Sequence, residues 1–419
     1  MSSPQTPRSI AIGERELVVM LALLQALHAF AVDAMLPALG LISNELNVID
    51  PNKRQLIIGM FLLGLGMGSL IPGSLADRYG RKTVLLTCVA AYVVLSLASA
   101  LVTDIDTLIA MRFVLGVASS GLTVLPQAII RDRFEGDRMA RLQSMIAMIF
   151  LVVPMLAPSI GQAIMLLAGW RWIFGAMGLV GLLMFGWAWL RLPETLHPEF
   201  RQSIEARTIG RNMAEAIFTR SSIGYVLGSA CMLGVGWGYI QSSQQLVAEH
   251  FGAGTLFPII FGGMALAMAT SNFANSRIVE KFGARRVSHT ALLTYLVVAV
   301  VQVTLARSGT ETLWQFVAVQ TLSMMLMGFV GANFGSIALQ PFARIAGAAS
   351  SIQAFIRLVL ASLIGWGVGQ SFDQTALPYS HALLLSGVAT LLLVLFSEKG
   401  RLFRRLNRPG APHPAEKTP

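Results

Sequence analysis

Two charged residues lie where long apolar segments are expected to cross a membrane, and they are the residues here best suited to move a charge. Asp33 is the only carboxylate placed well inside such a segment, and Arg112 is one of two arginines so placed. A charge there costs at least about 2.5 kcal/mol and often marks a proton or substrate pathway. The alternative is a packing salt bridge between two helices. We therefore treat Asp33 and Arg112 as candidate proton-coupling residues and Asp33 also as a candidate substrate ligand.

Helices must position these residues, because apolar segments of about 20 residues, long enough to cross a bilayer, recur from end to end. The 419-residue chain is 55% hydrophobic and 12% charged, about half the charge expected of a soluble protein. We predict an all-α membrane protein with twelve transmembrane helices in two six-helix halves. The predicted spans are residues 16–42, 55–76, 83–103, 107–130, 142–168, 172–190, 221–248, 255–276, 287–306, 312–340, 346–370 and 377–397.

Asp33 and Arg112 are expected at the same depth. The first span runs outward and the fourth runs inward, and a helix rises 1.5 Å per residue, so both residues lie roughly 6–9 Å to the outer side of the midplane. They are level and could pair. A proton on Asp33 would weaken the pair, and a cationic or polar substrate could compete for the same carboxylate.

The basic residues indicate the orientation. With the N-terminus in the cytoplasm, the outer loops hold only Lys53, Arg54, Arg171 and Arg307, while most of the 31 Lys and Arg fall in cytoplasmic segments. This asymmetry follows the positive-inside rule and predicts a multi-pass protein of the cell inner membrane with both termini cytoplasmic. The net charge of +10 does not indicate nucleic-acid binding, because the basic residues are scattered over separate loops without an aromatic platform.

Polar segments divide the chain. We predict an N-terminal half at 1–192, a cytoplasmic linker at 193–220, a C-terminal half at 221–398 and a cytoplasmic tail at 399–419.

No histidine or cysteine cluster has metal-ligand spacing, and no phosphate-binding loop of the GxxxxGK[ST] type occurs. Without a nucleophile–base constellation either, we expect no metal, no cofactor and no enzymatic activity.

The loop after the second span reads GSLADRYGRK, residues 73–82, and the loop after the eighth span repeats it as SRIVEKFGARR, residues 276–286. Internal repeats of this kind are typical of secondary transporters. The first loop resembles the loop 2–3 signature of the major facilitator superfamily at every fixed position. The resemblance implies a cytoplasmic gate built from Gly73, Asp77, Arg78, Gly80, Arg81 and Lys82.

Simple physics explains the gate residues. Gly73 would let two helices approach closely. Asp77 would lie against the positive N-terminus of the eleventh span and lock the gate, and Arg78, Arg81 and Lys82 would anchor the loop at the anionic inner leaflet.

Other segments narrow the resemblance. RFVLGVASSG, residues 112–121, resembles the fourth-span motif whose arginine, Arg112, is tied to proton coupling in the family. APSIGQ, residues 157–162, resembles the fifth-span antiporter motif in a degraded form that keeps Pro158 and Gly161. We take these two as further candidate gating residues, since a gate needs a bendable helix; simple helix kinking and close packing would also explain them. With the VDAMLPALGLI and LPETL segments, the chain resembles drug:proton antiporters of the bicyclomycin/chloramphenicol-resistance (Bcr/CflA) type.

Further polar residues are candidates to line a wide, mostly apolar cavity. They are Tyr239, Gln241, Gln245, Asn333 and Arg357. For each alone, helix–helix packing or hydrogen bonding is the alternative. Arg357 departs from the family pattern, and we expect it to meet an anionic substrate group or to share Asp33 with Arg112; capping by backbone carbonyls and Gln353 is the other possibility.

These features predict a proton-coupled secondary transporter that exports small amphipathic compounds or drugs, a function associated with antibiotic resistance. The alternatives are a metabolite, peptide or siderophore transporter on the same scaffold and, from another class, a non-transporting membrane sensor. The expected partners are a small-molecule substrate, protons and the lipid bilayer, with no nucleic acid, and the protein is expected to be a monomer.

Overall fold

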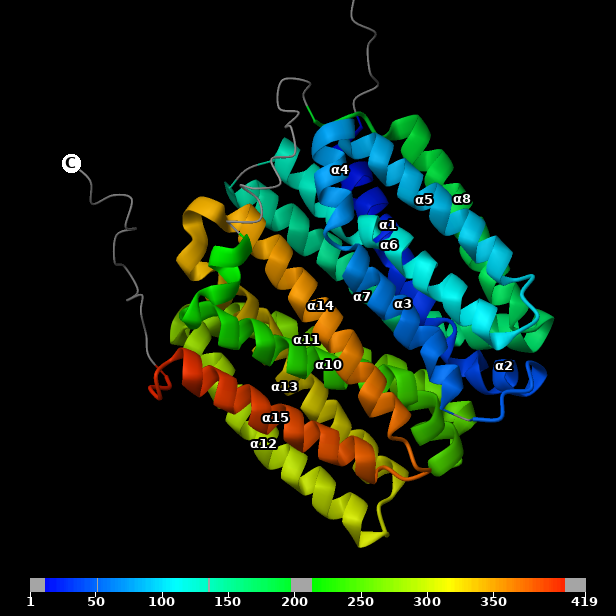
Figure 1. The fold of residues 1–419 in the computed structure, drawn as a ribbon, viewed down its shortest axis with the longest axis vertical. Coiled ribbons are helices and arrows are strands. Elements are labelled where there is room, and N and C mark those ends of the chain that lie inside the picture. The colour runs from blue at the N-terminus through cyan, green and yellow to red at the C-terminus, as the bar shows by residue number, and fades with distance from the viewer. Residues whose placement is uncertain (1–11, 51, 135, 197–212, 404–419) are drawn as a thin grey trace, which may run out of the picture. The chain divides into compact units, whose positions relative to one another are not determined.

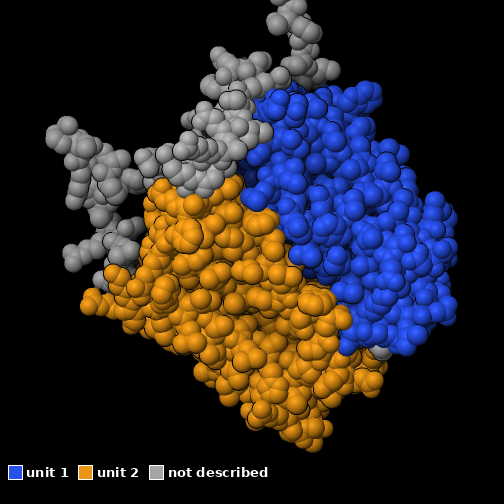
Figure 2. All heavy atoms as spheres, in the orientation of Figure 1, with its two compact units in different colours: residues 1–207, 254–262 blue, residues 208–253, 263–419 orange. Residues whose placement is uncertain are grey.

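The structure, a computed structural model, describes residues 12–50, 52–134, 136–196 and 213–403. Throughout these residues the regular elements are helices, which confirms the predicted all-α class (Figure 1). Among the described residues, eleven helices are long and apolar enough to cross a membrane, and a bent pair of shorter helices, counted as one span, brings the number to twelve. The chain folds as two compact units, coloured separately in Figure 2: unit 1 comprises residues 1–207 and 254–262, and unit 2 comprises residues 208–253 and 263–419.

Most of the predicted linker, residues 197–212, and most of the predicted tail, residues 404–419, lie outside the described residues. The helices of unit 1 are α1 (Glu14–Asp33), α2 (Leu39–Glu45), α3 (Leu56–Gly68), α4 (Ile71–Tyr79), α5 (Arg81–Ser99), α6 (Ile105–Arg133), α7 (Gly136–Ala168) and α8 (Arg171–Arg191). The main helices of unit 2 are α10 (Arg220–Gln244), α11 (Phe257–Phe282, whose first residues belong to unit 1), α12 (Ala284–Ser308), α13 (Leu313–Leu339), α14 (Ala346–Gln370) and α15 (Leu377–Ser397).

The second span is broken rather than continuous. Helices α3 and α4 meet at an angle of 45° across Ser69 and Leu70. Pro72 lies in the first turn of α4, where its missing N–H interrupts the helical hydrogen-bond ladder and produces a kink. The predicted span 55–76 is therefore present but bent.

The two loops that repeat in the sequence also repeat in backbone conformation. Gly80 has φ 99° and ψ 148° just before α5, and Gly283 has φ 86° and ψ 146° just before α12. A side chain is strained at such positive φ values, which explains glycine at both places. In each unit the first long helix packs on several others: α1 packs on α6, α7 and α8, and α10 packs on α13, α14 and α15.

Candidate functional site

Asp33 lies at a break in the first span. It is the last residue of α1, and Pro37 in the following short 3₁₀ helix, Leu36–Ala38, cannot continue the helical hydrogen bonds. The residue is buried, and among the described residues no hydrogen bond or ion pair involves its carboxylate. The described part of unit 1 therefore contains a buried carboxylate without a countercharge.

Arg112 is fully buried in α6 but does not neutralise Asp33. Its Nη2 donates to the carbonyl of Ala31 at 2.8 Å, and its Nε donates to the carbonyl of Ile57 at 3.0 Å. The guanidinium also lies over the Phe61 ring, 4.4 Å from the centroid. The ion pair that the matching depths suggested is therefore absent in this structure. Instead the guanidinium binds two backbone carbonyls, one of which, that of Ala31, lies two residues before Asp33. Its Nη1 is left without a partner among the described residues.

Glycine contacts between α3 and α6 hold Arg112 in this position. A Cβ added at Gly116 would come within 2.1 Å of the Phe61 carbonyl oxygen, and one at Gly64 would come within 2.1 Å of the Phe113 carbonyl oxygen. The two helix backbones thus touch reciprocally one turn away from Arg112, an arrangement that small residues permit in membrane helices.

The fifth-span motif packs directly beside Asp33. A Cβ at Gly161 would lie 2.0 Å from the carbonyl oxygen of Ala34, while Pro154 and Pro158 interrupt the same helix, α7. Gln162 Oε1 and His28 Nδ1 are buried without hydrogen-bond partners, and the His28 ring stacks on Phe150 of α7 at 5.4 Å.

The sequence did not single out His28 or Gln162 as site residues. Together with Asp33 and Arg112, these side chains add unsatisfied polar atoms to α1, α6 and α7 within one apolar unit. Such atoms can form hydrogen bonds with a polar ligand, and Asp33 and His28 can also bind a proton.

The polar residues of unit 2 that were predicted to line the cavity differ in their hydrogen-bond partners. Asn333 donates to Asn275 Oδ1 at 2.7 Å, and Tyr239 contacts the Met264 sulfur at 3.1 Å. Gln241 is buried with both side-chain amide atoms unpartnered. Gln245 is buried in a π-helical turn that follows α10. Hydrogen bonding between helices thus accounts for Asn333, whereas the substrate role of Gln241 stays a prediction.

The gate motif forms a compact ionic cluster in unit 1. Arg81 bridges Asp77 at 2.6 Å and Asp132 at 2.9 Å. The backbone N–H groups of Arg81 and Lys82 donate to the carboxylate of Glu194 at 2.8 and 3.2 Å. Glu194 belongs to the LPETL segment, so that segment anchors the gate loop.

Two other gate residues have simpler surroundings. A Cβ at Gly73 would meet only Val124, in ordinary contact at 3.9 Å, so the close helix approach expected there is not found. Arg78 lies over the neighbouring Tyr79 ring at 5.2 Å. The expected contact of Asp77 with the eleventh span would join the two units and stays a prediction.

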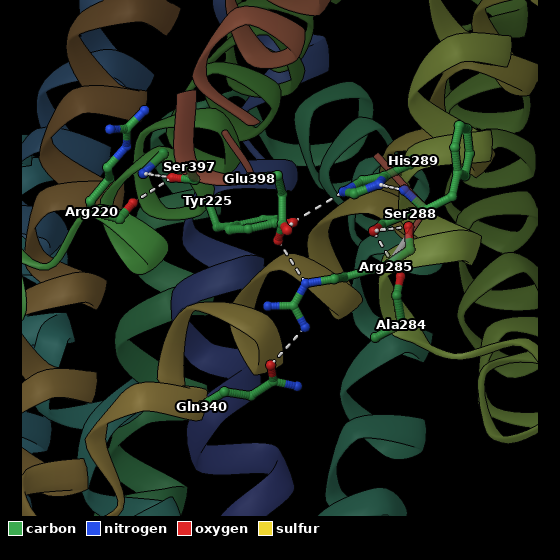
Figure 3. Close-up of polar contacts among 11 residues, drawn as sticks. Arg220, Tyr225, Ala284, Arg285, Ser288, His289, Gln340, Ser397 and Glu398 are labelled. Atoms are coloured by element: carbon green, nitrogen blue, oxygen red, sulfur yellow. Dashed lines mark hydrogen bonds and ion pairs between the residues drawn. The ribbon is translucent and has the colours of Figure 1, made fainter. Parts of the chain in front are cut away.

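Unit 2 contains a buried network that the sequence did not predict (Figure 3). Glu398, just beyond α15, accepts hydrogen bonds from the Tyr225 hydroxyl and from Arg285 Nε, each at 2.6 Å. The Tyr225 oxygen also lies 3.0 Å from His289 Nε2, and the Phe403 N–H donates to His289 Nδ1 at 3.1 Å. Because Tyr225 donates to Glu398, we assign the proton of a neutral His289 to Nε2.

This network corresponds to the Glu194 contacts of unit 1, since a glutamate after the last helix of each half binds the start of the third helix. Burial raises the pKa of Glu398, but the hydrogen bonds from Tyr225 and Arg285 outweigh it, so the pKa lies below its usual value of 4.5. The carboxylate form therefore stabilises the fold. Its contribution to the free energy of unfolding is complete above about pH 4.5 and disappears as the pH falls through the lowered pKa of Glu398.

Glu398→Gln is expected to lower stability at neutral pH, by about 1.5–3 kcal/mol for the lost hydrogen bonds to a charged group. Thermal unfolding of the purified variant and wild type from neutral pH down to about pH 3 measures this effect, and the difference should shrink below about pH 4.5. Glu280→Gln, at an exposed position, is the control. A difference that is independent of pH would contradict the ionic role of Glu398.

Comparisons with known proteins agree with the predicted fold and resemblance. The family model of the Major Facilitator Superfamily matches residues 21–366. An uncharacterized MFS-type transporter, YdgK of Bacillus subtilis, is 29% identical over 89% of this chain and 92% of its own length. A bicyclomycin resistance protein homolog of Haemophilus influenzae is 26% identical over 90% and 94%. The multidrug resistance protein MdtL of a Shewanella strain is 27% identical over 82% and 86%.

Solved structures share the architecture. A D-xylose-proton symporter superposes with a TM-score of 0.73 at 14% identity, covering 93% of this chain and 100% of that one. A bacterial homolog of the human lysosomal transporter Spinster, inward-facing and occupied, superposes with a TM-score of 0.67 at 16% identity, covering 95% and 97%. At these identities the likeness shows the fold alone, and it confirms the fold class predicted from the sequence.

Proposed function

Because the chain belongs to the Major Facilitator Superfamily of membrane transporters, we propose that it is a proton-coupled antiporter that exports small amphipathic compounds, drugs among them. The observation that carries the proposal is the buried, unpaired carboxylate of Asp33 beside the glycine contact of α7. The names of two relatives, a bicyclomycin resistance homolog and a multidrug resistance protein, support the choice of substrate class.

Exchange follows from competition for Asp33. An unpaired carboxylate among apolar side chains is costly, and either a proton or a cationic group of a substrate removes that cost. Because one carboxylate accepts only one of them at a time, binding of the substrate displaces the proton. Arg112 Nη1 has no partner in the described part of the chain, while Nη2 donates to the carbonyl of Ala31, two residues before Asp33, so Arg112 keeps a donor for an acceptor oxygen near Asp33.

The distribution of Lys and Arg supports the orientation that completes the proposal. With both termini in the cytoplasm, the ionic cluster around Arg81 and the network around Glu398 belong to the cytoplasmic side. We place the protein in the bacterial inner membrane as a monomer. In this orientation external protons reach Asp33 in one conformation, and cytoplasmic substrates reach it in the other.

The proposal is tested by expressing the chain in a bacterial host whose own efflux pumps are deleted. Expression should raise the resistance of the host to several amphipathic cations and lower its steady-state accumulation of rhodamine 123. A proton uncoupler should abolish the difference. If accumulation in expressing and empty-vector cells is equal across a broad panel of such compounds, export of this class is disproved.

Asp77→Asn is expected to slow turnover several-fold while leaving substrate binding nearly unchanged. The variant loses the ion pair with Arg81 and the proposed helix-terminus contact, worth about 0.3–2 kcal/mol, and it can act only on the equilibrium between conformations. Transport rates and equilibrium binding of the purified variant separate the two effects, with the exposed Asp50→Asn as control. A loss of binding equal to the loss of turnover would refute the gate role.

A further inference from the structure

Arg357 is a charged residue in the middle of a membrane helix for which the described part of unit 2 offers no countercharge. It is the twelfth of the 25 residues of α14, so about 17–20 Å of helix separate it from either end. The side chain is half-buried, and among the described residues no hydrogen bond, ion pair or ring contact involves its guanidinium.

Other arginines of unit 2 show what this side chain normally finds. Arg220 donates to the Phe396 carbonyl, Arg285 to Glu398, and Arg286 to the Phe403 carbonyl. All three lie at helix ends. Arg357 is both deeper in its span and without such a contact, although a guanidinium has five N–H donors and stays charged in proteins.

None of the acidic residues described in unit 2 lies at the depth of Arg357. All those described lie outside the middle of the spans, and they are Glu215, Glu249, Glu280, Glu311, Asp373 and Glu398. The polar neighbour one turn before Arg357 is also engaged elsewhere, because Gln353 Nε2 donates to the Ser222 hydroxyl and to the Ala338 carbonyl. The capping by Gln353 that the sequence left open is not seen.

The face of α14 that carries Arg357 is turned toward the neighbouring helices of unit 2. Ala361, one turn later on the same face, is fully buried, and its carbonyl lies 3.1 Å from the position that a Cβ of Gly234 on α10 would take. Arg357 Nη1 itself lies 3.9 Å from the Cβ position of Gly335 on α13. Lipid headgroups, about 15 Å or more from the bilayer centre, are therefore an unsuitable source of its counterion.

We propose that Arg357 binds a carboxylate of the transported compound. This inference rests on the proposed transport function and predicts that, among the amphipathic compounds transported, those that carry an acidic group bind more tightly. The planar guanidinium matches a carboxylate with two parallel hydrogen bonds, and the binding removes the cost of an uncompensated arginine at this depth. Gln241, whose amide atoms have no partner, lies farther along the same α10–α14 contact, where Gly365 packs on it, and supplies a second polar position.

Equilibrium binding of matched dyes to the purified full-length protein tests this inference without any transport step. The probes are rhodamine 110 and its methyl ester rhodamine 123, together with rhodamine B and its ethyl ester. Each pair differs in the free carboxylate. Wild type should bind the acids more tightly than the esters, and Arg357→Gln should weaken acid binding about tenfold or more, as expected for lost hydrogen bonds to a charged group, with ester binding unchanged.

Two further variants sharpen the result. Arg357→Lys keeps the charge without the two-pronged geometry and should restore only part of the acid preference. Arg220→Gln, at the first residue of α10, should leave the binding of all four dyes unchanged. Equal binding of acids and esters by wild type, binding of neither, or an Arg357→Gln variant that loses thermal stability but keeps the acid preference would each overturn the proposal.

The same dyes separate this inference from the proposed function. Acid-selective binding that depends on Arg357, without energised export of any dye, would leave the carboxylate site standing and refute proton-driven export. Energised export of the esters without acid-selective binding would support proton-driven export and refute the carboxylate site.

Discussion

Asp33→Asn is expected to reduce proton-driven transport to the level of protein-free vesicles while the protein still folds and inserts. Asparagine has nearly the same shape, so the helix break before Pro37 and the contact of Ala34 with Gly161 should persist. The amide neither binds nor releases a proton, and it removes a buried charge that has no partner among the described residues. Coupling should therefore be lost without a loss of stability.

Uphill transport driven by an imposed pH gradient, in proteoliposomes with matched protein content, measures the effect. Thermal unfolding in detergent checks the fold. Asp106→Asn is a suitable control, because Asp106 is exposed and pairs with Lys53 at a helix end. An Asp33→Asn variant that still concentrates substrate at the wild-type rate would remove Asp33 from the mechanism.

Gly116→Ala is expected to lower both the stability and the transport rate, because the added methyl group overpacks the contact between α3 and α6. The added Cβ would lie 2.1 Å from the Phe61 carbonyl oxygen and 2.9 Å from the Leu65 nitrogen, far inside van der Waals contact. Helices α3 and α6 must separate, at a cost of about 1–3 kcal/mol for an overpacked interior. The separation also draws Arg112 away from the Ile57 carbonyl and the Phe61 ring.

We therefore expect a lower unfolding temperature and a transport rate reduced more strongly than the amount of folded protein. Gly186→Ala provides the matched control, since a Cβ at Gly186 in α8 meets nothing within 4 Å. Both variants are measured by thermal unfolding and by transport per folded molecule. If Gly116→Ala unfolds at the wild-type temperature, the glycine contact does not position Arg112.

The fold was predictable because its signals are local. An apolar run of about 20 residues identifies a span wherever it occurs, and the repeated loops required glycine at 80 and 283 for a backbone with positive φ. The bend between α3 and α4 was missed, because Pro72 lies inside an otherwise continuous apolar run, and hydropathy alone does not show that a proline there bends the span.

The candidate site was predictable in its residue types but not in its contacts. Depth along two helices placed Asp33 and Arg112 level, yet the carbonyls of Ala31 and Ile57 compete for the guanidinium, and helix periodicity says nothing about such competition. The link between Tyr225 and Glu398 joins residues 173 positions apart, so no local pattern reveals it. The equivalent placement of Glu194 and Glu398 after the last helix of each half is the signal that could have found it.

The central claim, exchange of a proton for a substrate at Asp33, is tested most directly with wild-type protein in proteoliposomes whose lumen is more acidic than the medium. An outward proton gradient should drive accumulation of rhodamine 123 above its equilibrium level and dissipate the gradient as it does so. Nigericin, which collapses the gradient, should abolish the accumulation, and vesicles with Asp33→Asn should show neither effect. Accumulation that is unchanged after the gradient is collapsed, or equal in the Asp33→Asn vesicles, would contradict proton-coupled exchange at this carboxylate.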